Sequence, residues 1–178
     1  MAVKKTSVTH TLSKPKPITQ AFLLKHALPL IKSKGKLYSK HGDVLARLAT
    51  RTQTIVTIIS SGAETTNTAK KGDYIVTNNK TQTREEYVIP AKKFKERYKK
   101  QKQITKDSAL YSPLGKVMAL RLTKTILKTF NWPVKFHIQA PWKEKQYVSL
   151  GDYLVCPLTE DEIYRIGYKE FLETYKID

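Results

Sequence analysis

The densest group of side chains that could do chemistry is a basic run in the middle of the chain. Residues 92–106 read KKFKERYKKQKQITK and contain eight Lys or Arg with one acid, Glu96. Cations at this density attract phosphate groups, and on a helix they would surround an inward face made by Phe94 and Tyr98. An exposed helix that merely links two parts of the chain would have the same composition. The run therefore predicts either a phosphate-contacting rod or a solvated linker helix.

A second candidate for nucleic-acid contact is residues 140–147, APWKEKQY. A ring such as Trp142 can stack on a base while neighbouring lysines pair with phosphates, although a plain turn has the same composition. Because neither segment shows a regular spacing of base-reading residues, we expect weakly sequence-specific, salt-sensitive binding through the nucleic-acid backbone. The residues expected to contact nucleic acid are Lys92, Lys93, Lys95, Arg97, Lys99, Lys100, Lys102, Lys106 and Trp142.

A different chemistry is suggested by the polar segment 64–68, ETTNT. Its hydroxyl, amide and carboxylate groups could hydrogen-bond a nucleotide-like small ligand, with Asp73 and Arg84 expected beside it. An ordinary polar loop is the alternative, and Asp73 could instead fix a turn by accepting backbone N–H groups. The candidate ligand-binding residues are Glu64, Thr65, Thr66, Asn67, Asp73 and Arg84.

Signs of catalysis or metal binding are weak. The chain has one cysteine and four histidines in no recognisable catalytic frame, and Cys156 is expected to be a small buried apolar residue. No CxxC or CxxH pair and no phosphate-binding glycine loop occurs. The adjacent acids at 85–86 and 161–162 would point to opposite faces of a strand and are expected to be solvated. We therefore predict no catalytic residue, no metal site and no cofactor, and favour a non-enzymatic protein.

Net charge favours a polyanionic partner. The 178 residues carry a formal charge of +18, and residues 1–155 hold 30 Lys or Arg against nine acids. Nucleic acid is the most abundant intracellular polyanion, although a surface rich in lysine also serves solubility. No run of apolar residues is long enough to span a membrane, and the single cysteine fits a cytoplasmic location.

The elements that would position these groups occur twice. Three blocks recur in the same order, which predicts a duplication. Each copy is expected to contain a strand, at 53–60 or 133–139, then a hairpin entered at Gly-Asp, then a terminal helix. The matched positions are Leu37-Tyr38-Ser39 with Leu110-Tyr111-Ser112, Gly72-Asp73-Tyr74 with Gly151-Asp152-Tyr153, and Tyr87, Phe94 and Tyr98 with Tyr164, Phe171 and Tyr175.

The predicted fold class is α+β. Pro29 is expected to bend or end the helix that precedes the first unit. The expected organisation is a flexible basic arm at 1–16, an amphipathic helix at 17–36, a first repeat unit at 37–100, a basic linker at 101–109 and a second repeat unit at 110–178.

The Gly-Asp-aromatic strand at 72–76, the strand start Glu86-Tyr87 and the pair Phe94 and Tyr98 resemble the small bacterial and phage domains called PGDYG proteins. The resemblance covers residues 37–98 and, more weakly, 110–175. It implies an α+β domain of the kind found in phages and mobile elements, and it brings no activity with it.

Together these observations predict a non-enzymatic tandem-repeat protein that associates with nucleic acid, or with a nucleoprotein assembly, mainly through backbone phosphates. The alternative is a phage or bacterial domain that binds or modifies a nucleotide-like ligand through the first repeat.

Overall fold

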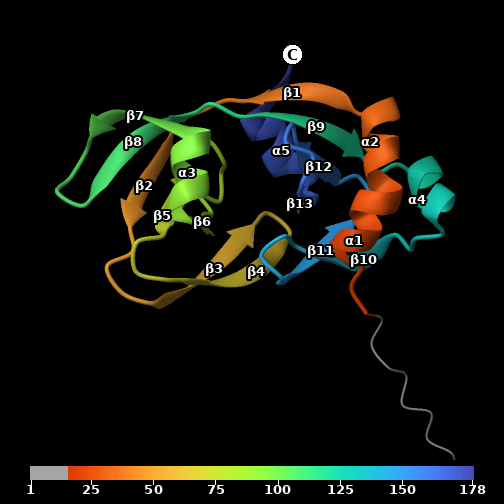
Figure 1. Ribbon diagram of the computed structural model, residues 1–178, viewed down its shortest axis with the longest axis horizontal. Helices are drawn as coiled ribbons and strands as arrows, with labels where there is room; N and C mark the ends of the chain where they lie inside the picture. Colours follow the sequence, from red (N-terminus) through yellow and green to blue (C-terminus); the bar gives the residue numbers. More distant parts are fainter. Residues whose placement is uncertain (1–15) are drawn as a thin grey trace, which may run out of the picture.

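Strands dominate the molecule, and a few short helices cover them (Figure 1). The computed structural model describes residues 16–178, so the predicted basic arm lies, apart from Lys16, outside the described residues. The α+β class is confirmed, with two five-stranded antiparallel sheets and two separate two-stranded hairpins.

The first sheet has the strand order β6-β5-β2-β8-β7, and α3 (Ala91–Arg97) packs on it. Phe94 of α3 is almost completely buried among the apolar residues of these strands. The strands are β2 (Val44–Leu48), β5 (Tyr74–Asn78), β6 (Glu86–Ile89), β7 (Tyr98–Gln103) and β8 (Ser108–Pro113).

The second sheet has the order β13-β12-β9-β1-β14, and α5 (Tyr168–Thr174) packs on it through Phe171. Its strands are β1 (Lys36–Lys40), β9 (Lys116–Arg121), β12 (Tyr153–Pro157), β13 (Tyr164–Ile166) and β14 (Tyr175–Ile177). If β6, β5, β2, β8 and β7 are matched with β13, β12, β9, β1 and β14, the two sheets have the same strand order.

The first strand of each predicted unit lies in the sheet of the other unit. β1 pairs with β9 and β14, whereas β8 pairs with β2 and β7. In Figure 1 the orange β1 accordingly runs alongside the green β9. The predicted boundaries at 37 and 110 therefore do not separate the two sheets, because each sheet is completed by a strand from the other half.

Each half also carries a hairpin between two strands of its sheet. β3 (Gln53–Ile59) pairs with β4 (Gly62–Ala69), and β10 (Lys135–Gln139) pairs with β11 (Lys145–Ser149). Side chains alternate along β3, since Ile55 and Ile59 are buried while Val56 and Ile58 are exposed. The second half has an additional helix, α4 (Lys124–Phe130), before β10.

The predicted amphipathic helix forms between Gln20 and Lys34. It consists of α1 (Gln20–Phe22), the π-helical segment η1 (Leu23–Ala27) and α2 (Leu28–Lys34). Pro29 neither ends nor breaks it. This proline directly follows the π-helical segment η1, in which the Leu28 N–H bonds to the Leu23 carbonyl, and this wider turn accommodates a residue that donates no helical N–H. Leu23, Ala27 and Ile31 are completely buried against the second sheet and the β10–β11 hairpin.

The Gly-Asp turns have nearly identical geometry in the two halves. The Asp73 carboxylate accepts the Lys70 N–H at 2.9 Å, and the Asp152 carboxylate accepts the Ser149 N–H at 2.7 Å. Gly72 and Gly151 have φ of +94° and +97°, a conformation that favours glycine. These matches agree with a duplicated unit, and a common origin of the two halves stays a prediction.

Two local predictions are wrong. Residues 92–106 do not form one helix, because α3 ends at Arg97 and the chain continues as β7, so residues 101–109 belong to the β7–β8 hairpin and form no linker. Residues 64–68 are not a loop but part of strand β4, as their threonine content would favour.

Candidate nucleic-acid interface

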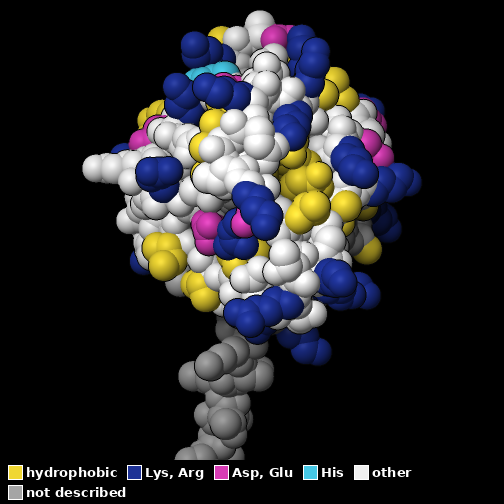
Figure 2. Space-filling model, turned by 90° about the vertical axis from the view of Figure 1, so that its left-hand side faces the viewer, with side chains coloured by type: hydrophobic (Ala, Val, Ile, Leu, Met, Phe, Trp, Pro, Cys, Tyr) yellow, Lys and Arg dark blue, Asp and Glu magenta, His cyan; other side chains and the backbone are white. Residues whose placement is uncertain are grey.

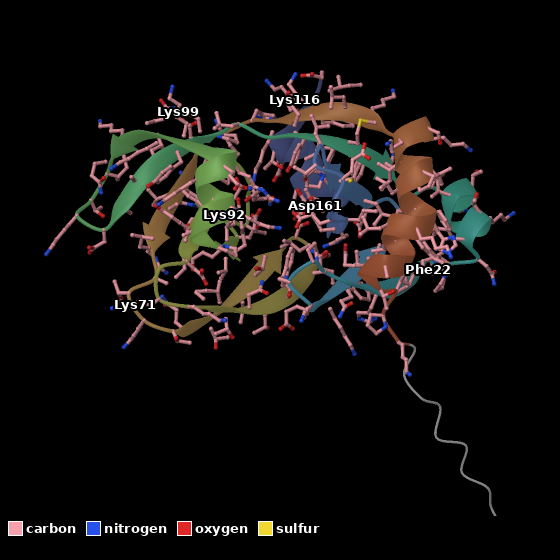
Figure 3. All side chains as sticks on the ribbon, in the orientation of Figure 1. Phe22, Lys71, Lys92, Lys99, Lys116 and Asp161 are labelled. Atoms are coloured by element: carbon pink, nitrogen blue, oxygen red, sulfur yellow. The ribbon has the colours of Figure 1, made fainter. Side chains whose placement is uncertain are left out.

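The basic run is divided between a helix and an edge strand. Lys92 and Lys95 are exposed on α3, while Lys99, Lys100 and Lys102 are exposed on β7. Figure 3 shows the two parts at different levels of the first sheet, with Lys92 on α3 and Lys99 at the upper edge. The cations are therefore spread over one end of the molecule and do not line a single helix.

Two members of the run are structural. Arg97 Nη2 lies 2.5 Å from Glu162 Oε1, and Lys93 Nζ contacts the other oxygen of the same carboxylate. Burial opposes the charge of Arg97, but the hydrogen bond and the attraction of Glu162 outweigh it and raise the pKa of Arg97. Glu162 is buried, so the expectation that it is solvated is wrong. These ion pairs join α3 to the chain just before β13, and hence the two halves.

The other six cations of the run are exposed and have no acidic partner within residues 16–178. Figure 2 shows the end of the molecule formed by the first half, where dark blue side chains are spread widely and few magenta ones lie among them. Lysines on an edge strand also discourage pairing with another chain, which would explain those on β7 without a ligand. The six cations are Lys92, Lys95, Lys99, Lys100, Lys102 and Lys106.

Trp142 lies elsewhere. It is 45% exposed in the turn between β10 and β11. Over the described part of the chain, no hydrogen bond or ring contact joins it to the cations of α3 and β7. The predicted nucleic-acid residues therefore do not form one continuous site.

The residues predicted to bind a small ligand are also not gathered by any contact among the described residues. Thr65, Thr66 and Asn67 lie on β4, and of Glu64 only its position in that strand is described. Asp73 is engaged in its turn, and Arg84, at φ +47°, donates to Asn79 Oδ1 at 3.2 Å. The contacts of Asp73 and Arg84 are those of turn residues.

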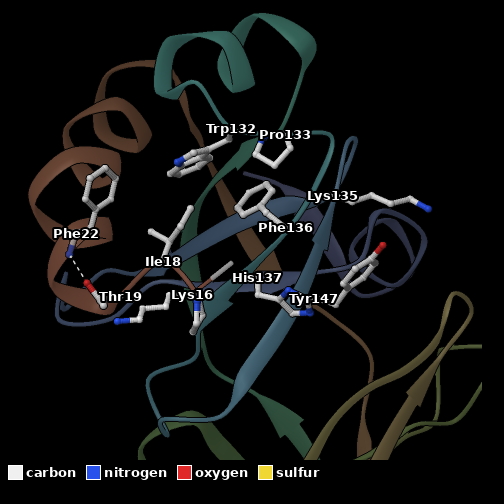
Figure 4. Close-up of a pocket in the computed structure, with 11 residues that line it drawn as sticks. Lys16, Ile18, Thr19, Phe22, Trp132, Pro133, Lys135, Phe136, His137 and Tyr147 are labelled. Atoms are coloured by element: carbon white, nitrogen blue, oxygen red, sulfur yellow. Dashed lines mark hydrogen bonds between the residues drawn. The ribbon is translucent and has the colours of Figure 1, made fainter. Parts of the chain in front are cut away.

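Sequence reasoning missed a groove on the second half (Figure 4). It has a volume of about 570 Å³ and lies between the start of α1 and the β10–β11 hairpin. Residues 16–19 form one wall because Ile18 donates to the His137 carbonyl at 2.9 Å and accepts from the Gln139 N–H at 2.8 Å. Five aromatic or imidazole rings line it, namely Phe22, Trp132, Phe136, His137 and Tyr147.

Among the described residues, cations but no acids line this groove. Lys16 and Lys135 are exposed at its rim, and neither forms an ion pair with any described residue. The sequence signal for this groove is the mixture of rings and lysines in residues 130–147, FNWPVKFHIQAPWKEKQY, of which only Trp142 is among the residues predicted to contact nucleic acid. His137 lies on the face of β10 opposite to the buried Phe136 and Ile138.

A polar cluster lies where the two sheets meet. Lys40 Nζ donates to Tyr98 Oη at 2.7 Å and to Tyr87 Oη at 3.1 Å. Burial, followed by the neighbouring phenol of Tyr98, raises the pKa of Tyr87 well above its ordinary value. Burial also raises the pKa of Tyr164 to about 12. Tyr87 and Tyr164 therefore stay neutral near pH 7. The hydroxyls of Tyr87 and Tyr98 lie 3.1 Å apart, within hydrogen-bond distance, which is a structural role.

No catalytic constellation is evident in the described residues. Cys156 is buried as predicted, and burial, followed by the nearby acids Glu160 and Asp161, raises the pKa of its thiol to about 11. Glu85 is buried and bonded to Asn78, Thr81 and Thr83, so its expected solvation is wrong. Over residues 16–178, His, Cys, Asp and Glu form no group suited to a metal ion.

Comparison with protein-family models, with curated proteins and with solved structures found no match to this chain. The resemblance to PGDYG domains therefore stays a prediction. Among the described helices, none is long and apolar enough to cross a membrane.

Proposed function

We propose that the protein is a non-enzymatic nucleic-acid-binding protein that contacts backbone phosphates. The observation that carries the proposal is the set of six exposed cations on α3, β7 and the turn after it, which have no acidic partner among residues 16–178. An unpaired surface ammonium group keeps its full attraction for a phosphate, whereas Lys93 and Arg97 share the negative charge of Glu162.

The chemistry of these cations favours binding without sequence specificity. Lysine is a flexible point charge, in contrast to the fork of arginine that reads guanine edges. Each phosphate that a lysine neutralises releases counterions, so affinity falls steeply with salt. Because Lys99, Lys100 and Lys102 project from one edge strand, a nucleic-acid backbone that follows β7 would meet several of them.

The test is the salt dependence of binding to a labelled oligonucleotide of about 20 residues, from about 50 to about 200 mM salt. Wild-type protein is expected to bind at low salt with a steep negative slope of log K against log salt. The triple variant Lys99→Gln, Lys100→Gln, Lys102→Gln should bind more weakly and lower the slope by about 2, since each phosphate contact to a single strand contributes about 0.7.

The matched control removes three cations that already pair with acids. Lys32 pairs with Glu160, Lys116 with Asp178, and Arg47 with Glu86. Their replacement by Gln changes the net charge equally and should alter the slope far less. Equal effects of the two triple variants would mean that net charge alone attracts the oligonucleotide. Absence of binding at low salt would overturn the proposal.

A further inference from the structure

We propose that the ring-lined groove between α1 and the β10–β11 hairpin binds unstacked bases of single-stranded nucleic acid. This inference rests on the proposed function and adds a second site to it. Phosphate contacts on the first half would hold any nucleic acid, whereas the groove on the second half would select strands whose bases are free.

The first support is the kind and arrangement of the rings. Trp132 is half-buried, with its ring stacked on Phe130 at 4.4 Å and tilted against Phe136 at 5.0 Å, so its position is fixed by packing. His137 and Tyr147 meet edge to face at 5.3 Å across the hairpin. Rings held in this way form a platform for stacking, which is available to every base.

The second support is charge complementarity around these rings. Lys16 and Lys135 extend from opposite sides of the ring group in Figure 4. Both are exposed, and neither has an acidic partner over the described range. Lys145 projects from the same face of β11 as Tyr147, two residues away. A strand with a base in the groove would therefore find a cation for the phosphate on either side.

Size and access explain the preference for single strands. A volume of about 570 Å³ falls within the range of about 300 to 1,000 Å³ that is usual for pockets that bind small ring compounds. Bases in a duplex are stacked on their neighbours and cannot enter, whereas bases in a single strand can unstack at low cost. The His137 imidazole and the Thr19 hydroxyl supply polar groups for base edges.

The experiment uses Trp132 as its own reporter. The chain has two tryptophans, so full-length protein with Trp142→Phe leaves Trp132 as the only one. The affinity of this background for each probe is measured first, and all comparisons are made within it. The probes are a mixed-sequence single-stranded oligonucleotide of about 20 residues, the duplex of the same length, and inorganic polyphosphate, which has no bases.

The expected result is saturable quenching of Trp132 fluorescence by the single strand over the concentration range in which it binds. The duplex and polyphosphate are expected to bind in a salt-dependent manner without this quenching. Tyr147→Leu, which removes a ring but keeps an apolar side chain, should weaken single-strand binding about tenfold and leave duplex binding unchanged. Lys135→Gln should weaken it less.

Tyr168→Leu is the matched control, because Tyr168 is 42% exposed on α5 and lies outside the groove. It should leave the preference for single strands unchanged. Equal affinity for single strand and duplex, with no effect of Tyr147→Leu, would overturn the inference while leaving the proposed function intact. Quenching by polyphosphate as strong as by the single strand would also overturn it. Loss of a self-associated species in Tyr147→Leu, with unchanged binding of single strands, would assign the groove to a second copy of the chain instead.

Discussion

The ring of Tyr38 meets the ring of Phe171 edge to face at 4.9 Å and 79°, although the two residues come from opposite ends of the chain. The rings of Tyr111 and Phe94 meet at 4.8 Å and 78° in the other sheet. Tyr38 lies on β1 and Tyr111 on β8, the strands that each half contributes to the sheet of the other. Equivalent aromatic cores are thus completed by exchanged strands, so neither half contains all of its own core.

Because each half contributes one strand to the sheet of the other half, a change in one half is predicted to loosen the sheet of the other half. Tyr38→Ala should lower the amide-exchange protection of β9, β14 and α5 more than that of β2 and α3. Tyr111→Ala, the matched variant, should have the opposite distribution. Hydrogen exchange read by mass spectrometry would measure both. A loss of protection in Tyr38→Ala that fell mainly on β2, β5 and α3 would contradict the exchanged arrangement.

The two helix phenylalanines should carry much of the stability. Phe94 and Phe171 are 1% and 0% exposed, and each stacks at 3.8 Å on a tyrosine of the underlying sheet. Phe94→Ala or Phe171→Ala should each lower the free energy of unfolding by about 3 to 5 kcal/mol, because burial is lost and a cavity remains. Denaturant titration would measure this. Leu172→Ala, at a neighbouring residue that is 52% exposed, should change the free energy of unfolding by less than about 0.5 kcal/mol. A loss in Leu172→Ala as large as in Phe171→Ala would contradict the prediction that the buried phenylalanines carry much of the stability.

The Cys156 thiol should be unreactive in the folded protein. It is 1% exposed, and burial raises its pKa to about 11, so almost no thiolate is present near pH 8. A disulfide reagent at about pH 8 should label it slowly in the native state and rapidly in denaturant. Native labelling at the rate of an exposed thiol would show that this part of β12 opens readily.

Glu170 should make the protein sensitive to acid. Burial alone would raise its pKa, but hydrogen bonds from Ser60, one of them the backbone N–H at 2.8 Å, outweigh this and lower the pKa below its ordinary 4.5. Because the folded-state pKa is the lower one, its stabilising contribution is complete above about pH 4.5 and is lost as pH falls through the folded-state value.

Glu170→Gln should therefore flatten the dependence of unfolding free energy on pH below about 4.5. Asp161 and Asp178, whose pKa values are also lowered, should account for part of the pH dependence that remains. Glu173→Gln removes the same charge from the same helix at a residue with no described hydrogen bond or ion pair. An equal flattening by Glu173→Gln would assign the effect to net charge rather than to the contact with Ser60.

Local signals in the sequence predicted the parts of the fold that depend on neighbouring residues. The Gly-Asp turns, the hairpin strands after them and the helices containing Phe94 and Phe171 all form where expected, because their turn residues and apolar spacing act over a few positions. The strand β7 was missed because lysine has low strand propensity, and this edge strand forms through its pairing with β8.

The exchange of β1 and β8 could not be read from the sequence. Both strands have the same Leu-Tyr-Ser pattern, so either would fit either sheet, and the choice depends on contacts between distant residues. The groove was missed for a related reason, since its walls come from residues 16–22 and 132–147 and no spacing rule connects them. Burial of Glu162 likewise depends on Lys93 and Arg97 from the other half.

The most direct test of nucleic-acid binding is lysine footprinting of the full-length protein, in which acetylation of each lysine is measured by mass spectrometry with and without a single-stranded oligonucleotide. We predict protection of Lys99, Lys100 and Lys102 by any nucleic acid, and of Lys16, Lys135 and Lys145 by the single strand only. Lys32, which already pairs with Glu160, should show no change. Unchanged reactivity at both groups of lysines, under conditions where the oligonucleotide is bound, would contradict the account.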